Sequence, residues 1–365
     1  MSEDRFPTLR VAAVQAAPVF LDREATFAKL EQLVAEAAGQ GAELVAFGES
    51  FLPGFPIWNG VLAPVDQHPF FERLVRAAIA VPGPDCDRLG ALARRHRVML
   101  SVGVNERSNA GVGTLWNTNL VFDPDGRLVN HRRKLVPTWY ERLTWAAGDG
   151  AGLDVVDLRG GQVGVLICGE NTNTLARFAL LAAGEQVHIA TYPPTWPFDR
   201  EPAREYDLTD AIRIRSAAHS FEGKVFTIVA ATALDDDALA QVAGEDDETR
   251  RLLTGGAFPA SMIVGPSGNI IAGPLVGEEG ILIAEVDLAE SIRLKQIHDI
   301  VGTYNRFDVF SLMVERRRLE PVHFHDAGAP GAADHVRPAT RWPSSAQPGH
   351  VSPNDEGTPT DDEST

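Results

Sequence analysis

The sequence predicts an α/β fold built in layers. Three segments near its start carry this prediction: an apolar, β-branched run at residues 9–15, a helical pattern at 23–38 and a second apolar run at 44–47. In residues 23–38 the apolar side chains recur at the spacing that places them on one helix face, and glycines end the segment. The order strand, helix, strand is typical of a domain in which helices cover a sheet.

Later segments continue this alternation. A turn rich in Pro, Asp and Gly at residues 123–126 predicts a hairpin between strands at 117–122 and 128–131. Similar turns at 159–161 and 266–269 predict two more hairpins. Further helices are expected at 72–80, 175–183, 207–222 and 288–296, and further strands at 97–104, 187–192, 225–231 and 280–286.

Two segments are predicted to lie outside the core. Residues 234–249 are rich in Asp, Glu and Ala, and we expect them to form a mobile, solvated surface segment. From about residue 320 the chain consists mainly of Pro, Gly, Ser, Asp and Glu, a composition that cannot bury a core. We therefore expect one domain at residues 1–319 and a low-complexity, disordered tail at 320–365.

Composition argues against several classes of function. The chain has 365 residues and a formal net charge of −17, which disfavours binding to nucleic acid or to an anionic membrane surface. It contains no apolar stretch long enough to span a bilayer, and its start does not resemble a signal peptide. The two cysteines are Cys86 and Cys168. The sequence leaves open a disulfide between them, but so few thiols in a large chain indicate a reduced, cytoplasmic protein.

Cys168 occupies a position that points to chemistry. It follows an apolar run at residues 163–167 and precedes three cap-forming residues and a helical pattern. The thiol is therefore predicted to lie where a strand ends and a helix begins. Free N–H groups at a helix start favour a thiolate and a neighbouring oxyanion, which indicates a nucleophile. The alternative is a buried cysteine that acts as a small hydrophobic residue, and this segment alone does not decide between the two.

Three more polar residues occupy comparable positions. Glu49 closes one predicted strand, Lys134 follows another, and Glu141 lies shortly after Lys134. Because catalytic groups in α/β sheets gather at strand ends, we expect these side chains to lie near Cys168. Each also has a plainer interpretation: Glu49 as a cap, Lys134 as a solvated charge and Glu141 as half of an ion pair with Arg142.

Several motifs around these residues make the chain similar to one protein family. They span most of residues 8–315 and read VAAVQAAP at 11–18, FGESFLPG at 47–54, RRKLVPT at 132–138, GVLICGEN at 164–171, QVHIA at 186–190 and YNRFD at 304–308. The chain resembles the nitrilase branch of the carbon–nitrogen hydrolase superfamily. Ordered motifs around Glu, Lys and Cys are far more specific than any one of them alone.

The resemblance implies a four-layer α-β-β-α sandwich that pairs into dimers through its helices. It also implies that Glu49, Lys134 and Cys168 are catalytic, with Glu141 beside them. Cys168 would attack the carbon of an organic nitrile after Glu49 accepts its proton, while Lys134 and the Gly169 N–H stabilise the charge on nitrogen. Thioimidate and thioester intermediates would then yield ammonia and a carboxylic acid, without a metal or another cofactor.

The chain departs from the family pattern in two places. Gly169 stands where many members have Trp immediately after the cysteine, and we expect the missing indole to enlarge or reshape the pocket. The sequence GTYNRFD at 302–308 differs from the common Gly-His-Tyr-x-Arg-Pro-Asp, which bears on assembly or packing rather than on catalysis.

Aromatic residues at the predicted strand ends are candidates for the substrate pocket. Trp58, Trp139, Tyr192 and Trp196 would line an apolar cavity there, with ordinary packing under loops as the alternative. His188 lies within a predicted buried strand, where we expect a hydrogen-bonded core histidine.

The function expected from these features is hydrolysis of a small-molecule nitrile by a homodimer or larger homo-oligomer. One alternative is hydrolysis of an amide, a carbamoyl amine or hydrogen cyanide by the same residues. An alternative of another class is a non-catalytic homo-oligomer that uses the fold as a scaffold.

Overall fold

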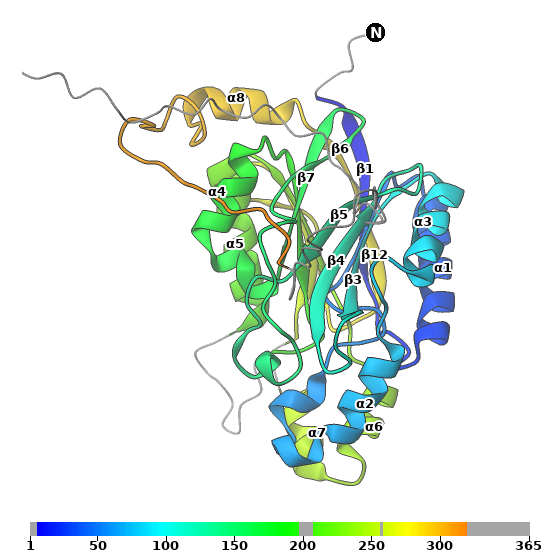
Figure 1. The fold of residues 1–365 in the computed structure, drawn as a ribbon. Coiled ribbons are helices and arrows are strands. Elements are labelled where there is room, and N and C mark those ends of the chain that lie inside the picture. The colour runs from blue at the N-terminus through cyan, green and yellow to red at the C-terminus, as the bar shows by residue number, and fades with distance from the viewer. Residues whose placement is uncertain (1–5, 197–206, 256–257, 320–365) are drawn as a thin grey trace, which may run out of the picture. The chain divides into compact units, whose positions relative to one another are not determined.

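Two six-stranded β-sheets face each other in this computed structural model, which describes residues 6–196, 207–255 and 258–319 (Figure 1). The strand order is β12-β1-β2-β3-β4-β5 in the first sheet and β11-β10-β9-β8-β7-β6 in the second. The strands are β1 (Thr8–Gln15), β2 (Leu44–Phe47), β3 (Met99–Arg107), β4 (Leu115–Phe122), β5 (Leu128–Arg133), β6 (Val156–Leu158), β7 (Gly161–Ile167), β8 (Val187–Tyr192), β9 (Phe226–Ala231), β10 (Ala260–Val264), β11 (Ile270–Val276) and β12 (Gly280–Asp287). The tail predicted at 320–365 lies outside the described residues.

Helices cover the outer faces of both sheets. The helices of the described residues are α1 (Arg23–Gly39), α2 (His68–Ala77), α3 (Pro84–His96), α4 (Thr174–Ala182), α5 (Leu208–Gly223), α6 (Asp236–Ala243), α7 (Asp247–Thr254) and α8 (Glu290–Ile297), with the 3₁₀ turns η1 (Ile57–Gly60), η2 (Pro64–Asp66), η3 (Trp139–Leu143) and η4 (Cys168–Thr172). Helices α1 and α3 pack on the first sheet, and α4 and α5 lie outside the second (Figure 1). The predicted four-layer α-β-β-α sandwich is confirmed.

The main core lies between the two sheets. Val11 and Ala13 of β1 pack there in one cluster with Val165 of β7 and Ile189 of β8. Burying each large aliphatic side chain contributes about 1.5–3 kcal/mol. Because both faces of β1 are covered, the strand is buried along most of its length and its sequence reads as a continuous apolar run rather than an alternating one.

Helix α1 shows how the outer layers form. The Asp22 carboxylate accepts a hydrogen bond from the Ala25 N–H and so caps the first turn. Phe27, Leu30 and Val34 recur at helical spacing and are buried against the outer face of the first sheet. The predicted helix at residues 23–38 therefore lies where its apolar face indicates.

Residues 234–249 differ from the mobile, solvated segment that their composition predicts. They form α6 and the start of α7, which group with α2 at one end of the sandwich in Figure 1. Leu239 and Leu253 are buried in the apolar cluster that these helices share. The acidic residues that suggested solvation include two caps, because the Asp235 and Asp246 carboxylates accept hydrogen bonds from the first turns of α6 and α7.

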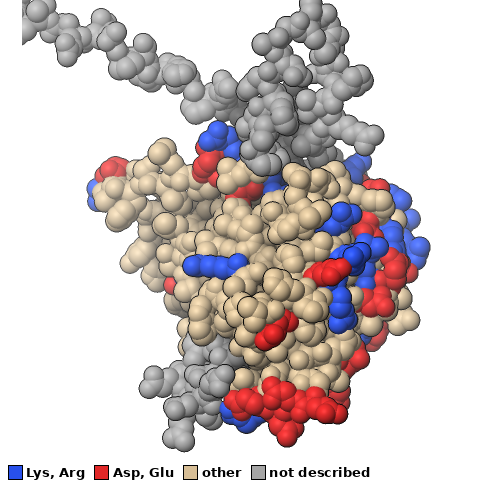
Figure 2. Space-filling view, turned by 60° about the horizontal axis from the view of Figure 1, so that its bottom comes forward, with Lys and Arg blue, Asp and Glu red and all other residues tan. Residues whose placement is uncertain are grey.

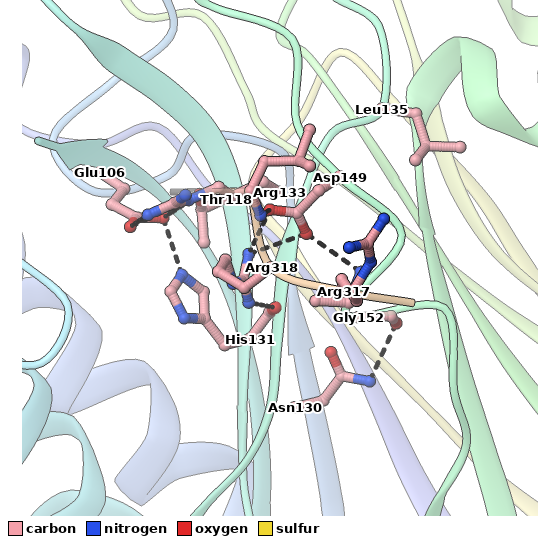
Figure 3. Close-up of polar contacts among 12 residues, drawn as sticks. Glu106, Thr118, Asn130, His131, Arg133, Leu135, Asp149, Gly152, Arg317 and Arg318 are labelled. Carbon is pink, nitrogen blue, oxygen red and sulfur yellow. Dashed lines mark hydrogen bonds and ion pairs between the residues drawn. The ribbon is translucent and has the colours of Figure 1, made fainter. Parts of the chain in front are cut away.

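The last described segment of the chain is tied to β5. Arg318 donates to the His131 carbonyl oxygen over 2.7 Å and to the Asp149 carboxylate over 3.2 Å (Figure 3). The His131 ring in turn faces the buried Glu106 carboxylate at 2.8 Å. These contacts hold β5 in place immediately before Lys134.

Charged side chains of both signs are mixed on the face that Figure 2 presents. Lys and Arg lie next to Asp and Glu along one side, and acidic side chains gather at the lower edge (Figure 2). The described residues of this face thus form no continuous basic surface of the kind that phosphate binding needs. Within 6–196, 207–255 and 258–319, no helix is long and apolar enough to cross a membrane.

Candidate active site

The three residues predicted to be catalytic follow strands of both sheets. Glu49 comes after β2 and Lys134 after β5 in the first sheet, whereas Cys168 follows β7 in the second. The Glu49 backbone joins the sheets, because its N–H donates to the Tyr192 carbonyl oxygen and its own carbonyl oxygen accepts from the Thr232 hydroxyl. The strand ends of the two sheets therefore meet, and the three side chains converge there.

Lys134 lies between two carboxylates. Its Nζ donates to Glu49 Oε1 over 2.8 Å and to Glu141 Oε2 over 2.6 Å, and all three side chains are buried. Glu141 belongs to η3, where its Oε2 also accepts from the Thr138 N–H over 2.7 Å. Asn117 of β4 donates to Glu49 Oε1 over 2.6 Å. These hydrogen bonds hold the Lys134 ammonium in the interior, away from solvent.

Cys168 begins η4 with a left-handed backbone, at a φ of 49°. Its sulfur and one carboxylate oxygen each of Glu49 and Glu141 lie within 4.8 Å of one another. The following α-helix, α4, starts only at Thr174, where the Asn173 side chain caps it. The thiol therefore lies where β7 ends, as predicted, but the helix that begins there is a 3₁₀ turn and the predicted α-helix starts after it.

The pKa values of the three groups are set by burial and by one another. Burial raises the pKa of Glu49 to about 7, with Lys134 opposing the shift and Glu141 adding to it. Burial and the Glu49 carboxylate raise the pKa of the Cys168 thiol well above its usual range. Burial opposes the charge of Lys134, but the Glu141 and Glu49 carboxylates outweigh it and raise the pKa of the ammonium. Burial thus disfavours the thiolate that a helix start would favour.

Comparison with known proteins assigns this arrangement to a family. The model of the carbon-nitrogen hydrolase family matches residues 10–296. This chain belongs to the carbon–nitrogen hydrolase family. It is 37% identical over 317 residues to a protein named Nitrilase 3 from an unknown prokaryotic organism, with 86% of this chain and 92% of that protein covered. An aliphatic nitrilase from Rhodococcus rhodochrous is 37% identical over 319 residues, with 87% and 85% covered. Within the family, the chain belongs to the nitrilase branch.

Solved structures of carbon–nitrogen hydrolases share the fold. The enzyme from Helicobacter pylori G27 aligns with a TM-score of 0.62 over 80% of this chain and 94% of that one, at 19% identity. Nit3 from Saccharomyces cerevisiae, a member of the nitrilase superfamily, aligns with a TM-score of 0.64 over 83% and 99%, at 18% identity. At such identities the likeness concerns the fold alone.

Aromatic rings belong to the apolar cluster around the thiol of this carbon–nitrogen hydrolase. Tyr192 and Trp196 are buried in the same apolar cluster as Cys168. The Tyr140 ring centroid lies 4.4 Å from that of Trp196, and the centroid of the exposed Trp139 ring lies 6.5 Å from it. The sequence does not distinguish Tyr140 from its neighbour Trp139, since both are aromatic residues of the same segment. The predicted role of these rings in binding substrate stays a prediction.

Trp58 has different neighbours. Its buried ring stacks on Phe70 with centroids 5.3 Å apart and meets Phe20 edge-on. It packs in the cluster shared with α6 and α7, and Tyr140 contacts both that cluster and the one around the thiol. The structure thus gives Trp58 the packing role that was the alternative, and its place in a substrate pocket stays a prediction.

Gly169 follows the nucleophile where many relatives are expected to have an indole. A Cβ built at this position would lie 3.1 Å from the Thr138 hydroxyl oxygen. Thr138 is also the residue that precedes η3 and forms a capping box with Glu141. A large side chain at residue 169 would therefore press on the turn that holds Glu141.

Glu170 joins the cysteine turn to the lysine segment. Its Oε1 accepts from the Leu135 N–H over 2.6 Å and forms a buried ion pair with Arg132 at 2.8 Å, while its Oε2 accepts from the Ile167 N–H over 2.9 Å. The sequence shows Glu170 beside the nucleophile but not these partners, because most of them lie over thirty residues away in the chain. This residue couples the positions of the proposed nucleophile and of Lys134.

Two further expectations are decided by the structure. Cys86 and Cys168 are both free thiols, so the disulfide that the sequence left open is absent from the described residues. His188 is a hydrogen-bonded core histidine, as predicted, with Glu185 on one ring nitrogen and Asn171 on the other.

Proposed function

We propose that this protein hydrolyses an organic nitrile to a carboxylic acid and ammonia, with Cys168 as the nucleophile. The observation that carries the proposal is the convergence in one buried site of a thiol, a carboxylate with a pKa of about 7 and an ammonium held by carboxylates. Relatives named as nitrilases, at 34–37% identity over most of the chain, support a nitrile as the substrate.

The first step in this proposal is a proton transfer. Glu49 Oε2 makes no hydrogen bond within the described residues, so it is free to accept the proton of Cys168. The thiolate then forms a bond to the nitrile carbon, and an electron pair of the C–N triple bond moves onto nitrogen. Lys134 and the Gly169 N–H stabilise this charge, and nitrogen takes the proton from Glu49 to give a thioimidate.

Two water molecules complete the reaction. The first gives a proton to Glu49 and adds to the thioimidate carbon, and Glu49 passes this proton to the nitrogen. The hydroxyl group of the tetrahedral intermediate then gives up its own proton, which Glu49 transfers to the nitrogen, so that the C–N bond breaks and ammonia leaves. The resulting thioester is attacked by the second water, which releases the carboxylic acid and restores the Cys168 thiol. If the thiolate leaves the first tetrahedral intermediate instead of ammonia, the product is the amide.

Glu141 acts on the position of Lys134 in this scheme. Its Oε2 bonds both the ammonium and the Thr138 N–H, so it ties Lys134 to η3. Two carboxylates also keep Lys134 charged, which the stabilisation of a developing negative charge requires.

Ammonia release from a panel of aromatic and aliphatic nitriles, each paired with its amide, tests the substrate class. We expect turnover of nitriles by the wild-type protein and none by C168A. Ammonia from amides alone would make an amide the substrate, and ammonia from neither would favour a scaffold without catalysis.

We also propose that the protein assembles at least into a homodimer through α4 and α5. Leu175 of α4 and Ile214 and Phe221 of α5 are exposed apolar residues on this outer layer. Beside α4 runs a groove of about 1110 Å³ whose lining includes Tyr304 and Phe310. Leu175 also lines this groove, and exposed apolar surface of this kind marks interaction sites in soluble proteins.

A further inference from the structure

Behind the cysteine turn lies a buried cluster that the proposed reaction does not use. Glu185 accepts hydrogen bonds from two histidine rings, with its Oε1 at 2.7 Å from His188 Nδ1 and its Oε2 at 2.8 Å from His219 Nε2. All three side chains are almost fully buried. On its other side, His188 Nε2 lies 2.8 Å from Asn171 Oδ1. The cluster therefore reaches the turn that carries the nucleophile.

Hydrogen-bond donors and acceptors fix the orientation of the side chains in this cluster. Asn171 Nδ2 donates to the Cys168 carbonyl oxygen over 3.0 Å, so its Oδ1 is the atom that faces His188 and accepts from it. His188 Nδ1 faces a carboxylate, which also accepts. Each ring nitrogen of His188 thus faces an acceptor, and Nδ1 pairs with the buried Glu185 carboxylate. His219 donates through Nε2 and stays neutral.

The titration behaviour of the neighbouring groups agrees with this assignment. Although burial opposes it, the two histidines lower the pKa of Glu185 to about 2. Burial and the positive charge of His188 lower the pKa of His219 to about 4. At neutral pH the Glu185 carboxylate is therefore ionised and the His219 ring is neutral.

Asn171 controls the orientation of a single peptide group. Because the peptide between Cys168 and Gly169 is planar and trans, its carbonyl and its N–H point in opposite directions. Holding the Cys168 carbonyl on Asn171 Nδ2 therefore aims the Gly169 N–H away from the cluster. The same bond restrains Cys168 in its left-handed conformation, which is strained for a residue with a side chain and persists only where neighbours enforce it.

We propose that His188, held by Glu185, is a positioning residue that acts through Asn171 to aim the Gly169 N–H at the nitrogen on which charge develops. The proposal rests on the proposed nitrile hydrolysis. The cluster makes no contact with substrate in this proposal. It affects the reaction only through the peptide that follows Cys168. A misaligned N–H weakens binding of the transition state more than binding of the substrate, so the effect falls on kcat rather than on KM.

Two substitutions of His188 separate this role from simple packing. In H188Q the amide nitrogen takes the place of Nε2 and keeps a donor for Asn171, whereas in H188N it takes the place of Nδ1 and keeps a donor for Glu185. We expect H188Q to retain kcat within about fivefold, the effect of one lost hydrogen bond. We expect the kcat of H188N to lie at least about tenfold below that of H188Q, with a nearly unchanged KM. Equal losses in the two variants, in step with their melting temperatures, would overturn the proposal.

H188Q leaves the buried Glu185 carboxylate with one partner fewer, which lowers stability independently of Asn171. The same two substitutions made in an E185Q background act without the buried carboxylate, and we expect the difference in kcat between the two His188 substitutions to persist there.

A metal ion bound by Glu185, His188 and His219 would be a different explanation of this cluster, since their ligand atoms lie within 4.8 Å of one another. Dialysis of the wild type against EDTA should leave its activity unchanged, and a loss would contradict the hydrogen-bonded assignment.

Hydrogen exchange of the backbone amides tests the same hydrogen-bond network without any turnover of substrate. We expect the amides of residues 169–170 to exchange faster in H188N than in H188Q or the wild type. If no nitrile is hydrolysed but this exchange pattern appears, the proposed function is wrong and the positioning of the turn stands. If nitriles are hydrolysed and the two variants match in both kcat and exchange, the positioning role is wrong and the proposed function stands.

Discussion

Glu49 has the environment of a base that works near neutral pH. Its carboxylate is buried, so its pKa of about 7 lies above the usual value, and the fraction ready to accept a proton falls as the pH is lowered through 7. We expect kcat/KM to fall about tenfold per pH unit below 7, because only the ionised form activates the thiol. Measuring kcat/KM between pH 5.5 and 8.5, with circular dichroism to confirm folding, checks this. A flat profile across that range would mean that another group is the base.

Lys134 separates two buried carboxylates, and its removal should affect both activity and stability. We expect K134M to lose at least about 10²-fold in kcat, because the developing charge loses its ammonium. Leaving Glu49 and Glu141 without their cation should lower the free energy of unfolding by about 3–5 kcal/mol, with the larger loss above pH 7, where the Glu49 carboxyl must ionise.

A surface lysine provides the control for this substitution. Lys29 pairs with the exposed Glu279, so K29M should change the free energy of unfolding by no more than about 1 kcal/mol. Urea unfolding at two pH values measures both variants. A K134M protein as stable as K29M at each pH would show that the buried ion pairs are not formed.

At the residue scale the position of the candidate site could be predicted from the sequence, but the partners that its side chains contact could not. Glu49, Lys134 and Cys168 follow strands in the sequence, and strand ends are where α/β proteins place chemistry. The partners Asn117 and Tyr140 depend on how two sheets and a 3₁₀ turn meet in space. No local pattern encodes that meeting, and the left-handed backbone at the cysteine likewise depends on tertiary contacts.

At the scale of elements, α6 and α7 show where composition misleads. Their acidic residues suggested a solvated segment, yet the apolar residues between them recur at helical spacing and face one shared cluster. An Asp before such a spacing is a cap signal, and Asp235 is one. The strands of the two sheets were easier to predict, because covered strands read as unbroken apolar runs.

Leu253 tests whether α7 is a packed part of the molecule. Its side chain is fully buried, so we expect L253A to lower the free energy of unfolding by about 2–5 kcal/mol. The exposed Thr254 next to it offers a matched control, since T254A should stay within about 0.5 kcal/mol. Chemical denaturation of both variants measures this, and a neutral L253A would restore the solvated segment that the composition predicted.

At the scale of the whole molecule, the sandwich brings together side chains that are distant in sequence. The backbone contacts of Glu49 to Tyr192 and Thr232 show that the first sheet meets the second at the site. The alternation of elements predicted a layered fold, whereas the pairing of two sheets came from the resemblance, because periodicity does not say which sheet a strand joins. A domain limit at residue 319 and a cytoplasmic location stay predictions.

Assembly is the prediction that belongs to this scale. If α4 and α5 form the dimer surface, L175E combined with F221E should yield monomers, because two buried charges at an interface are strongly unfavourable. V65E, at an exposed residue outside these helices, should leave the assembly unchanged. Analytical ultracentrifugation of the wild type, the double variant and V65E measures their assembly states. A double variant that sediments like the wild type would place the interface elsewhere.

The central claim is that the Cys168 sulfur forms a covalent bond to the substrate carbon. Intact-protein mass spectrometry during turnover of a slow nitrile tests it most directly, with digestion to locate the adduct. The account predicts an added mass of one nitrile, or of its acyl group, on Cys168 in the wild type and none in C168A. An adduct on the buried Cys86, or nitrile turnover by C168A without any adduct, would contradict it.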